Sequence, residues 1–225
     1  MTSSQLRQQL LDTMRSSTSS GLNRGATGNL SVRFKEGFLI TPSGISPTDM
    51  SADDMVFMDM QGKWSGDHKP SSEWRLHREI LLNRPEFDAV LHAHSTFATV
   101  LACLGKEIPP FHYMIAAAGG KTVRCAPYAT FGTQTLAAYA LEALQDRQAC
   151  LLANHGLLVA ARDLPQALAL AIEVENLCEQ YCHLLQIGTP IILSDAEMEV
   201  VLEKFKGYGP NAVIEANESL QKTDS

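Results

Sequence analysis

Hydrophobic residues along the chain follow two spacings, one typical of helices and one typical of strands. Near the N-terminus, leucine and methionine recur every three or four positions, which predicts an amphipathic helix from Leu6 to about Gly21. The same spacing, or a capping signal, predicts further helices at residues 70–82, 95–104, 133–144, 164–185 and 194–205. Short apolar runs bounded by turn residues predict strands at residues 29–34, 38–41, 56–60, 87–94, 122–125 and 150–153.

The order of these elements predicts the fold class. The early strands follow one another as in hairpins, whereas the later strands alternate with helices. We therefore expect an α/β protein, a layered sandwich with a mixed sheet rather than a purely parallel one. No linker, repeat or low-complexity segment divides the 225 residues, so we expect one domain over residues 1–209 and a polar tail at residues 210–225.

The composition of the chain mainly excludes classes of binding partner. The net charge is −7 with acidic and basic residues interspersed, and the basic stripe that nucleic-acid binding requires is missing. No apolar segment is long enough to span a membrane, and the N-terminal residues lack the apolar core of a signal peptide. The five cysteines lie in apolar surroundings, as is typical of reduced packing residues. We expect a cytoplasmic protein with no nucleic-acid or membrane partner.

Two histidines one residue apart, His92 and His94, end an apolar run that is predicted to be a strand. Side chains two apart on a strand project to the same face, so this pair is half of a metal site. His155 has a similar setting, because it follows an apolar strand and precedes a glycine. Three imidazoles suit a zinc-like ion that keeps one position open, and Glu73 is a candidate fourth ligand. Strand-end packing and hydrogen bonding of the histidines remain the alternative.

Three segments rich in glycine and small polar residues, 25–31, 41–44 and 71–73, indicate an anion pocket. Each alone is typical of a turn, but backbone N–H groups, short hydroxyls and a helix N-terminus together can hold a phosphate without lysine. No P-loop or dinucleotide motif occurs, so ATP and NAD are not expected. Glu73 would lie at that helix N-terminus, which favours its anionic form. His77, four residues further on, is expected to be a surface or core histidine.

Eight segments together make the chain similar to the class II aldolase/adducin family, from the N-terminal helix to about Gly209. They occur in the order and at the spacing of that family. The segments are residues 28–33, 39–44, 70–75, 92–94, 112–120, 125–132, 155–157 and 201–209. The resemblance implies a three-layer α/β/α sandwich around a mixed, mostly antiparallel sheet, and a four-fold symmetric homotetramer with active sites at subunit interfaces.

The resemblance also implies roles for individual residues. One Zn²⁺ per chain would be bound by four residues, named here the Glu–His cluster: Glu73, His92, His94 and His155. Glu73 would also be the acid/base, and Tyr113 would donate a proton toward the aldehyde, with Phe131 and Tyr208 near the active site. Six residues, named here the phosphate cradle, would hold the phosphate of a small phosphorylated sugar: Gly28, Asn29, Ser43, Gly44, Ser71 and Ser72. Ala93 and Asn154 are expected to alternate away from the ligands.

The activity that follows from the resemblance is a lyase reaction in which zinc acts as a Lewis acid. We expect reversible cleavage of a ketose 1-phosphate, with L-fuculose 1-phosphate giving dihydroxyacetone phosphate and L-lactaldehyde. Ribulose 1-phosphate or a 5-deoxypentulose 1-phosphate is the alternative substrate, and sugar-phosphate epimerisation is the alternative reaction. Epimerase relatives usually carry Asp at the position of Glu73, and non-catalytic adducin-like members lack the three histidines, so both are disfavoured.

Overall fold

The computed structural model describes residues 2–207, and a mixed β-sheet lies at its centre. The strands of this sheet are β1 (Asn29–Phe34), β2 (Gly37–Ile40), β3 (Val56–Asp59), β4 (Trp64–Ser65), β5 (Ala89–Ala93), β6 (Arg124–Ala126), β7 (Ala149–Leu152) and β8 (Gly156–Ala161). Their order across the sheet is β4-β3-β2-β1-β5-β8-β7-β6. Neighbouring strands are antiparallel except β6 and β7, which run parallel.

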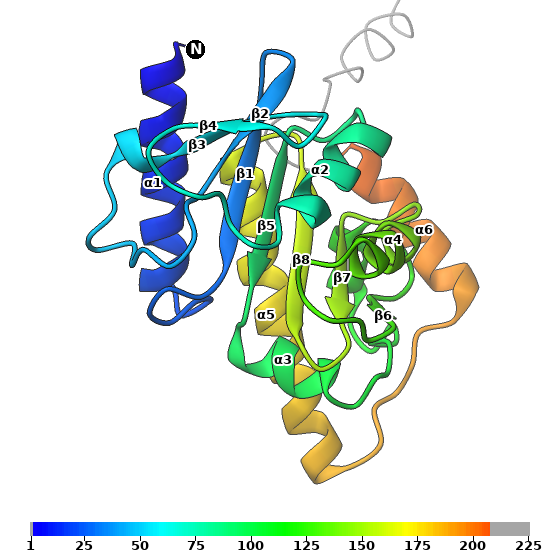
Figure 1. The fold of residues 1–225 in the computed structure, drawn as a ribbon. Coiled ribbons are helices and arrows are strands. Elements are labelled where there is room, and N and C mark those ends of the chain that lie inside the picture. Colours follow the sequence, from blue (N-terminus) through cyan, green and yellow to red (C-terminus); the bar gives the residue numbers. More distant parts are fainter. Residues whose placement is uncertain (1, 208–225) are drawn as a thin grey trace, which may run out of the picture.

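Helices cover both faces of the sheet (Figure 1). The α-helices are α1 (Ser3–Ser19), α2 (Trp74–Asn83), α3 (Thr96–Ala102), α4 (Gln134–Ala143), α5 (Leu164–Ile187) and α6 (Asp195–Lys206). Helices α1, α3 and α5 pack on one face, and α2 and α4 pack on the other. The expected three-layer α/β/α sandwich around a mostly antiparallel sheet is confirmed. Within residues 2–207, no helix has the length and apolar character needed to cross a bilayer.

The alternation of side chains along β1 and β5 decides what lies beneath α2. Leu91 and Ala93 belong to the core beneath α1, α3 and α5, so His92 projects to the opposite face, beneath α2. On the neighbouring strand Leu30 also faces the α5 side, and Asn29 therefore faces α2. Because Asn29 pairs directly with His92 in the sheet, their polar side chains meet on one face.

Three local features differ from the predicted elements. The two residues of β4 are both exposed and carry no apolar periodicity, so they had no signal in the sequence. The segment between residues 109 and 120 contains a 3₁₀ helix, η2 (Tyr113–Ala118), which packs against α5 and α6. The apolar run that begins at residue 150 is two antiparallel strands, β7 and β8, joined by a turn at Asn154, whose φ is +55°.

Helix caps account for the close agreement at the C-terminal helices. Asp163 accepts a hydrogen bond from the backbone N–H of Gln166 and begins α5, and Ser194 forms a capping box with Glu197 at the start of α6. The predicted domain boundary at residue 209 and the polar tail lie outside the described residues. The assignment of a single domain over residues 1–209 therefore stays a prediction.

Candidate metal centre and substrate pocket

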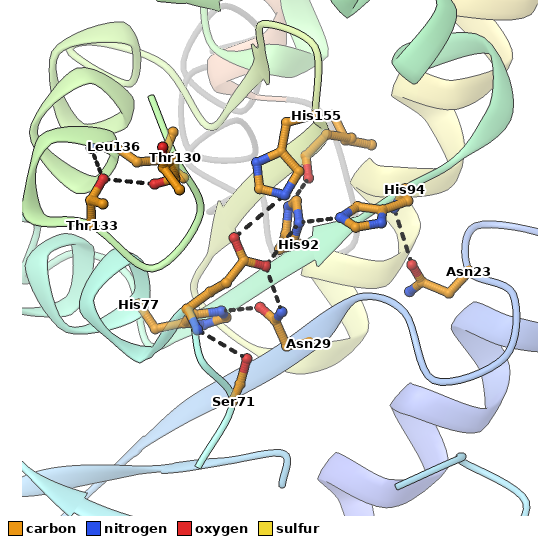
Figure 2. A network of polar contacts seen from close by, with 12 residues as sticks. Asn23, Asn29, Ser71, His77, His92, His94, Thr130, Thr133, Leu136 and His155 are labelled. Carbon is orange, nitrogen blue, oxygen red and sulfur yellow. Dashed lines mark hydrogen bonds and ion pairs between the residues drawn. The ribbon is translucent and has the colours of Figure 1, made fainter. Parts of the chain in front are cut away.

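The structure brings the four residues of the Glu–His cluster together from separate elements (Figure 2). His92 is on β5 and His94 follows that strand, His155 is in the turn between β7 and β8, and Glu73 immediately precedes α2. One potential ligand atom from each residue lies within 4.8 Å of those of the other three. Such spacing allows four donor atoms to bind a single cation.

A hydrogen bond from Nδ1 of His92 orients the ring so that Nε2 is available to a metal ion. The Nδ1–H donates to the carbonyl oxygen of Leu157 at 2.9 Å, so in the neutral imidazole Nε2 carries the free lone pair. That Nε2 lies 2.9 Å from Nε2 of His94 and 3.2 Å from Oε2 of Glu73. Burial lowers the pKa of His92 to about 4, although the nearby carboxylate of Glu73 favours the protonated form. The ring is therefore neutral at pH 7, as metal binding requires.

Glu73 supplies a buried carboxylate with one oxygen atom satisfied and one free. Oε2 accepts a hydrogen bond from the side-chain amide of Asn29 at 3.0 Å. Oε1 lies 3.4 Å from Nε2 of His155 and has no hydrogen-bond partner among the described residues. Burial would raise the pKa of Glu73, but His92, His155 and the Asn29 amide outweigh it and hold the pKa below its usual value. An unpartnered buried oxygen atom beside three imidazoles fits a bound divalent cation.

Contacts from the face covered by α1, α3 and α5 hold the backbone around His94. Its N–H donates to Oδ1 of Asn23 at 3.2 Å, and Asn23 is buried below Gly28. Just beyond it, the hydroxyl of Ser95 and two N–H groups in the first turn of α3 donate to the carboxylate of Glu175 on α5. Sequence reasoning did not identify Asn23 or Glu175, because neither lies in a motif and both act through contacts between distant segments.

A pocket of about 410 Å³ opens beside the Glu–His cluster. All six residues of the phosphate cradle line it, together with Glu73, His94 and His155. The two loops that carry most of the cradle are joined by backbone hydrogen bonds, from Ser43 N–H to the Lys69 carbonyl and from Ser71 N–H to the Thr41 carbonyl. A cradle of glycines and hydroxyls next to a candidate metal centre is suited to a phosphorylated ligand.

Another part of the pocket wall comes from the loop that follows β6. Tyr128, Ala129 and Phe131 line the pocket, and both aromatic rings are more than half exposed. Asn154 also lines it, contrary to the expectation that this residue alternates away from the ligands. Asn154 is in a turn with a left-handed backbone, so the alternation of a strand does not apply there. Ala93, in contrast, points away into the opposite core as expected.

One predicted active-site residue, Tyr113, is not brought to the pocket formed by the described residues. Tyr113 begins η2, stacks on the ring of His112 and is 52% exposed, and it does not line the pocket. Tyr208 lies outside the described residues.

Residues 8–182 match the family described as Class II Aldolase and Adducin N-terminal domain. The match spans most of the chain, and the chain belongs to this family. Its similarity to characterised members narrows the class: the chain is a class II aldolase, a metal-dependent lyase.

Proteins similar to this chain are named for two different groups of substrate. The 5-methylthioribulose-1-phosphate/5-deoxyribulose-1-phosphate aldolase of Rhodospirillum rubrum is 56% identical over 209 residues, covering 93% of this chain and 95% of that protein. The L-fuculose phosphate aldolase of Escherichia coli is 47% identical over 210 residues, covering 93% and 98%. A solved L-fuculose 1-phosphate aldolase superposes with a TM-score of 0.88 at 45% identity, covering 92% of this chain and 98% of that one.

Proposed function

We propose that the chain is a zinc-dependent aldolase that reversibly cleaves a ketose 1-phosphate between C3 and C4, releasing dihydroxyacetone phosphate and an aldehyde. One observation carries this proposal: the Glu–His cluster and the phosphate cradle line the same pocket. A ketose 1-phosphate has a phosphate at one end and a carbonyl group two atoms away, so both parts of the site can act on one molecule.

The Glu–His cluster would bind the zinc ion through three imidazole nitrogens and one carboxylate. When bound there, zinc supplies a Lewis acid that polarises the substrate carbonyl and stabilises negative charge developing next to it. Purified protein is expected to contain about one zinc ion per chain.

Glu73 would hold and transfer the proton at C3 of the dihydroxyacetone-phosphate fragment. Its carboxylate is anionic, and one of its oxygen atoms is free of other hydrogen bonds. Because the Asn29 amide holds the other oxygen atom, the oxygen without a hydrogen bond would exchange a proton with a substrate in the pocket once the carboxylate is displaced from the zinc ion.

Tyr113 would handle the proton on the aldehyde oxygen, in the pocket of a neighbouring copy rather than its own. Its exposed ring and its position outside its own pocket support this assignment. The proposal therefore includes a homotetramer with active sites between subunits. Phe131 lies at the pocket and Tyr208 is assigned there from the resemblance alone. A cytoplasmic location is part of the proposal and rests on the five free cysteines.

The substrate assignment depends on the part of the pocket wall that comes from the loop after β6. Tyr128, Ala129 and Phe131 present an aromatic and apolar surface there, which suits an aldehyde with an apolar tail. Cleavage of 5-deoxyribulose or 5-methylthioribulose 1-phosphate releases such an aldehyde, and the 56% identical relative bears the names of these substrates. L-fuculose 1-phosphate, which releases the more polar lactaldehyde, is the second candidate and is favoured by the 47% identical relative.

A substrate panel tests this proposal through the release of dihydroxyacetone phosphate. We expect 5-deoxyribulose and 5-methylthioribulose 1-phosphates to be cleaved with kcat/KM roughly 10- to 100-fold above L-fuculose 1-phosphate, because an apolar wall disfavours an added hydroxyl by about this factor. D-ribulose 1-phosphate and L-rhamnulose 1-phosphate complete the aldolase arm. Turnover of L-ribulose 5-phosphate alone would replace the aldolase by an epimerase, whereas preference for L-fuculose 1-phosphate would overturn only the aldehyde assignment.

A further inference from the structure

A continuous series of hydrogen bonds between buried polar side chains leads from Ser31 on β1 to Glu73. Figure 2 shows the part of this series that joins His77 and Asn29. Ser31 Oγ lies 2.7 Å from Nδ1 of His77, and Nε2 of His77 lies 2.5 Å from Oδ1 of Asn29. The amide nitrogen of Asn29 then lies 3.0 Å from Oε2 of Glu73. Each of these four residues is at most 6% exposed. Both ring nitrogens of His77 form hydrogen bonds within this series.

The direction of every hydrogen bond in this series follows from chemistry. A carboxylate only accepts, so Asn29 must direct its NH₂ group toward Glu73 and its carbonyl oxygen toward His77. That carbonyl oxygen also only accepts, so Nε2 of His77 must carry the proton. A neutral imidazole has one N–H, which leaves Nδ1 to accept from the hydroxyl of Ser31. Burial lowers the pKa of His77 to about 3, consistent with a neutral ring.

The opposite tautomer of His77 would reverse the amide. With the proton on Nδ1, the Nε2 lone pair would attract the NH₂ group of Asn29 and turn its carbonyl oxygen toward the carboxylate of Glu73. Two acceptors would then face each other in a buried space, which is unfavourable for both. Ser31 lies on the side of His77 remote from Asn29, and its hydroxyl donates to Nδ1 in the tautomer that Glu73 and Asn29 impose.

We propose that His77 is a positioning residue for the acid/base: it holds the Asn29 amide so that its NH₂ group, and not its carbonyl oxygen, faces Glu73. This inference rests on the proposed function of Glu73. The same amide belongs to the phosphate cradle, so His77 also links the residue that contacts the phosphate with the residue that moves the proton. A histidine that only filled the core would still need hydrogen-bond partners for its nitrogens, but it would not need a partner that contacts the acid/base.

Neutron diffraction on crystals of the purified enzyme tests the tautomer without reference to activity. We expect a hydrogen isotope on Nε2 of His77, none on Nδ1, and the Ser31 hydroxyl directed at Nδ1. In the Ser31→Ala variant Glu73 still orients the Asn29 amide, so the hydrogen isotope is expected to stay on Nε2. A proton on Nδ1 in the unmodified enzyme would overturn the proposal.

Kinetics test whether this arrangement matters for the reaction. We expect His77→Phe to lower kcat and kcat/KM together by roughly 10- to 100-fold with KM little changed, because the misplaced group acts in the chemical step. His77→Gln, whose amide can still donate to Asn29, should recover most of kcat. Ser31→Ala should lower kcat by less than His77→Phe does. Ser31 contacts neither Asn29 nor Glu73 in this series of hydrogen bonds, so its effect on kcat would act through His77.

Thr13→Val is the matched control, because it removes a buried hydroxyl that bonds only to the backbone of α1. It should leave kcat unchanged. If His77→Phe matched this control in kcat, or if the His77 variants changed KM alone, the positioning role would be wrong. An enzyme that cleaved no ketose phosphate would instead refute the proposed function, and the neutron result would still decide the tautomer.

Discussion

The two oxygen atoms of the Glu73 carboxylate have different surroundings, and this asymmetry suits a residue that both binds a cation and moves a proton. Oε2 is held by Asn29, whereas Oε1 faces His155 with no hydrogen bond among the described residues. A buried carboxylate with an unsatisfied oxygen atom is destabilising unless a cation or a ligand proton completes it. The site is therefore expected to bind a cation or a proton at Oε1 of Glu73.

Replacing the carboxylate by an amide tests this assignment directly. We expect Glu73→Gln to reduce kcat by about 10²- to 10⁴-fold, the usual loss when a general acid/base is removed. Circular dichroism and the unfolding temperature should stay close to those of the unmodified enzyme, because glutamine preserves shape. Activity within a few-fold of the unmodified enzyme would exclude Glu73 from proton transfer.

His77 makes a prediction about stability and pH. Its pKa is about 3 in the folded chain and 6.5 in an unfolded one, so below pH 6.5 the unfolded chain binds a proton that the folded chain rejects. Stability should therefore fall as the pH decreases from 6.5 toward 3, by about 1.4 kcal/mol per pH unit from this residue. Urea unfolding of the metal-free protein at pH 7, 6 and 5 should show a shallower pH dependence for His77→Gln. Equal slopes would mean that His77 does not stay neutral in the folded chain.

At the scale of elements, the phosphate cradle depends on loops that approach one another too closely for larger side chains. Gly28 has a φ of +75°, and a Cβ atom there would lie 2.2 Å from the side chain of Asn23. Asn23 cannot move freely, because it accepts the hydrogen bond from the N–H of His94. The loop that carries Gly28 and the strand end that carries His94 therefore share one buried asparagine.

The Gly28→Ala variant tests this link, and Gly25→Ala is its control. Both glycines have positive φ, but a Cβ at Gly25 meets no atom within 4 Å. We expect Gly28→Ala to destabilise the protein by about 1–3 kcal/mol and to weaken both substrate and metal binding. Gly25→Ala should cost about 1 kcal/mol and leave metal affinity unchanged. Calorimetry and metal titration measure both effects, and equal losses in the two variants would refute a specific role for Asn23.

At the scale of the whole molecule, the site lies on the sheet while the two cores lie beneath the helices. The Glu–His cluster comes from the end of β5, the β7–β8 turn and the residue before α2. The apolar residues that hold the two layers of helices are separate from it. Assembly of the site therefore follows from folding of the sandwich and does not require a metal to form the core.

Metal removal is expected to abolish activity without unfolding the protein. Chelation should lower the unfolding free energy by about 2.7 kcal/mol relative to protein in metal at 100 times its Kd, since only the folded chain forms the site. Added Zn²⁺ should restore both activity and the unfolding temperature. Full cleavage of a ketose phosphate by metal-free protein would contradict the proposed mechanism, and loss of secondary structure on chelation would contradict an independently folded core.

Sequence alone determined the helices, most strands and the types of donor atom in the site, because these depend on local periodicity, on caps such as Ser194, and on spacing within a strand, as between His92 and His94. It also identified Glu73 and His155 as candidates to join them. Only the tertiary structure decided which polar side chains face these ligands. Asn29 and Glu73 are 44 residues apart, and Asn23 and His94 are 71 apart. Such contacts depend on which strands pair and which helix covers them. For the same reason, only the position of α2 over β1 gives His77 its contacts with Asn29 and Ser31.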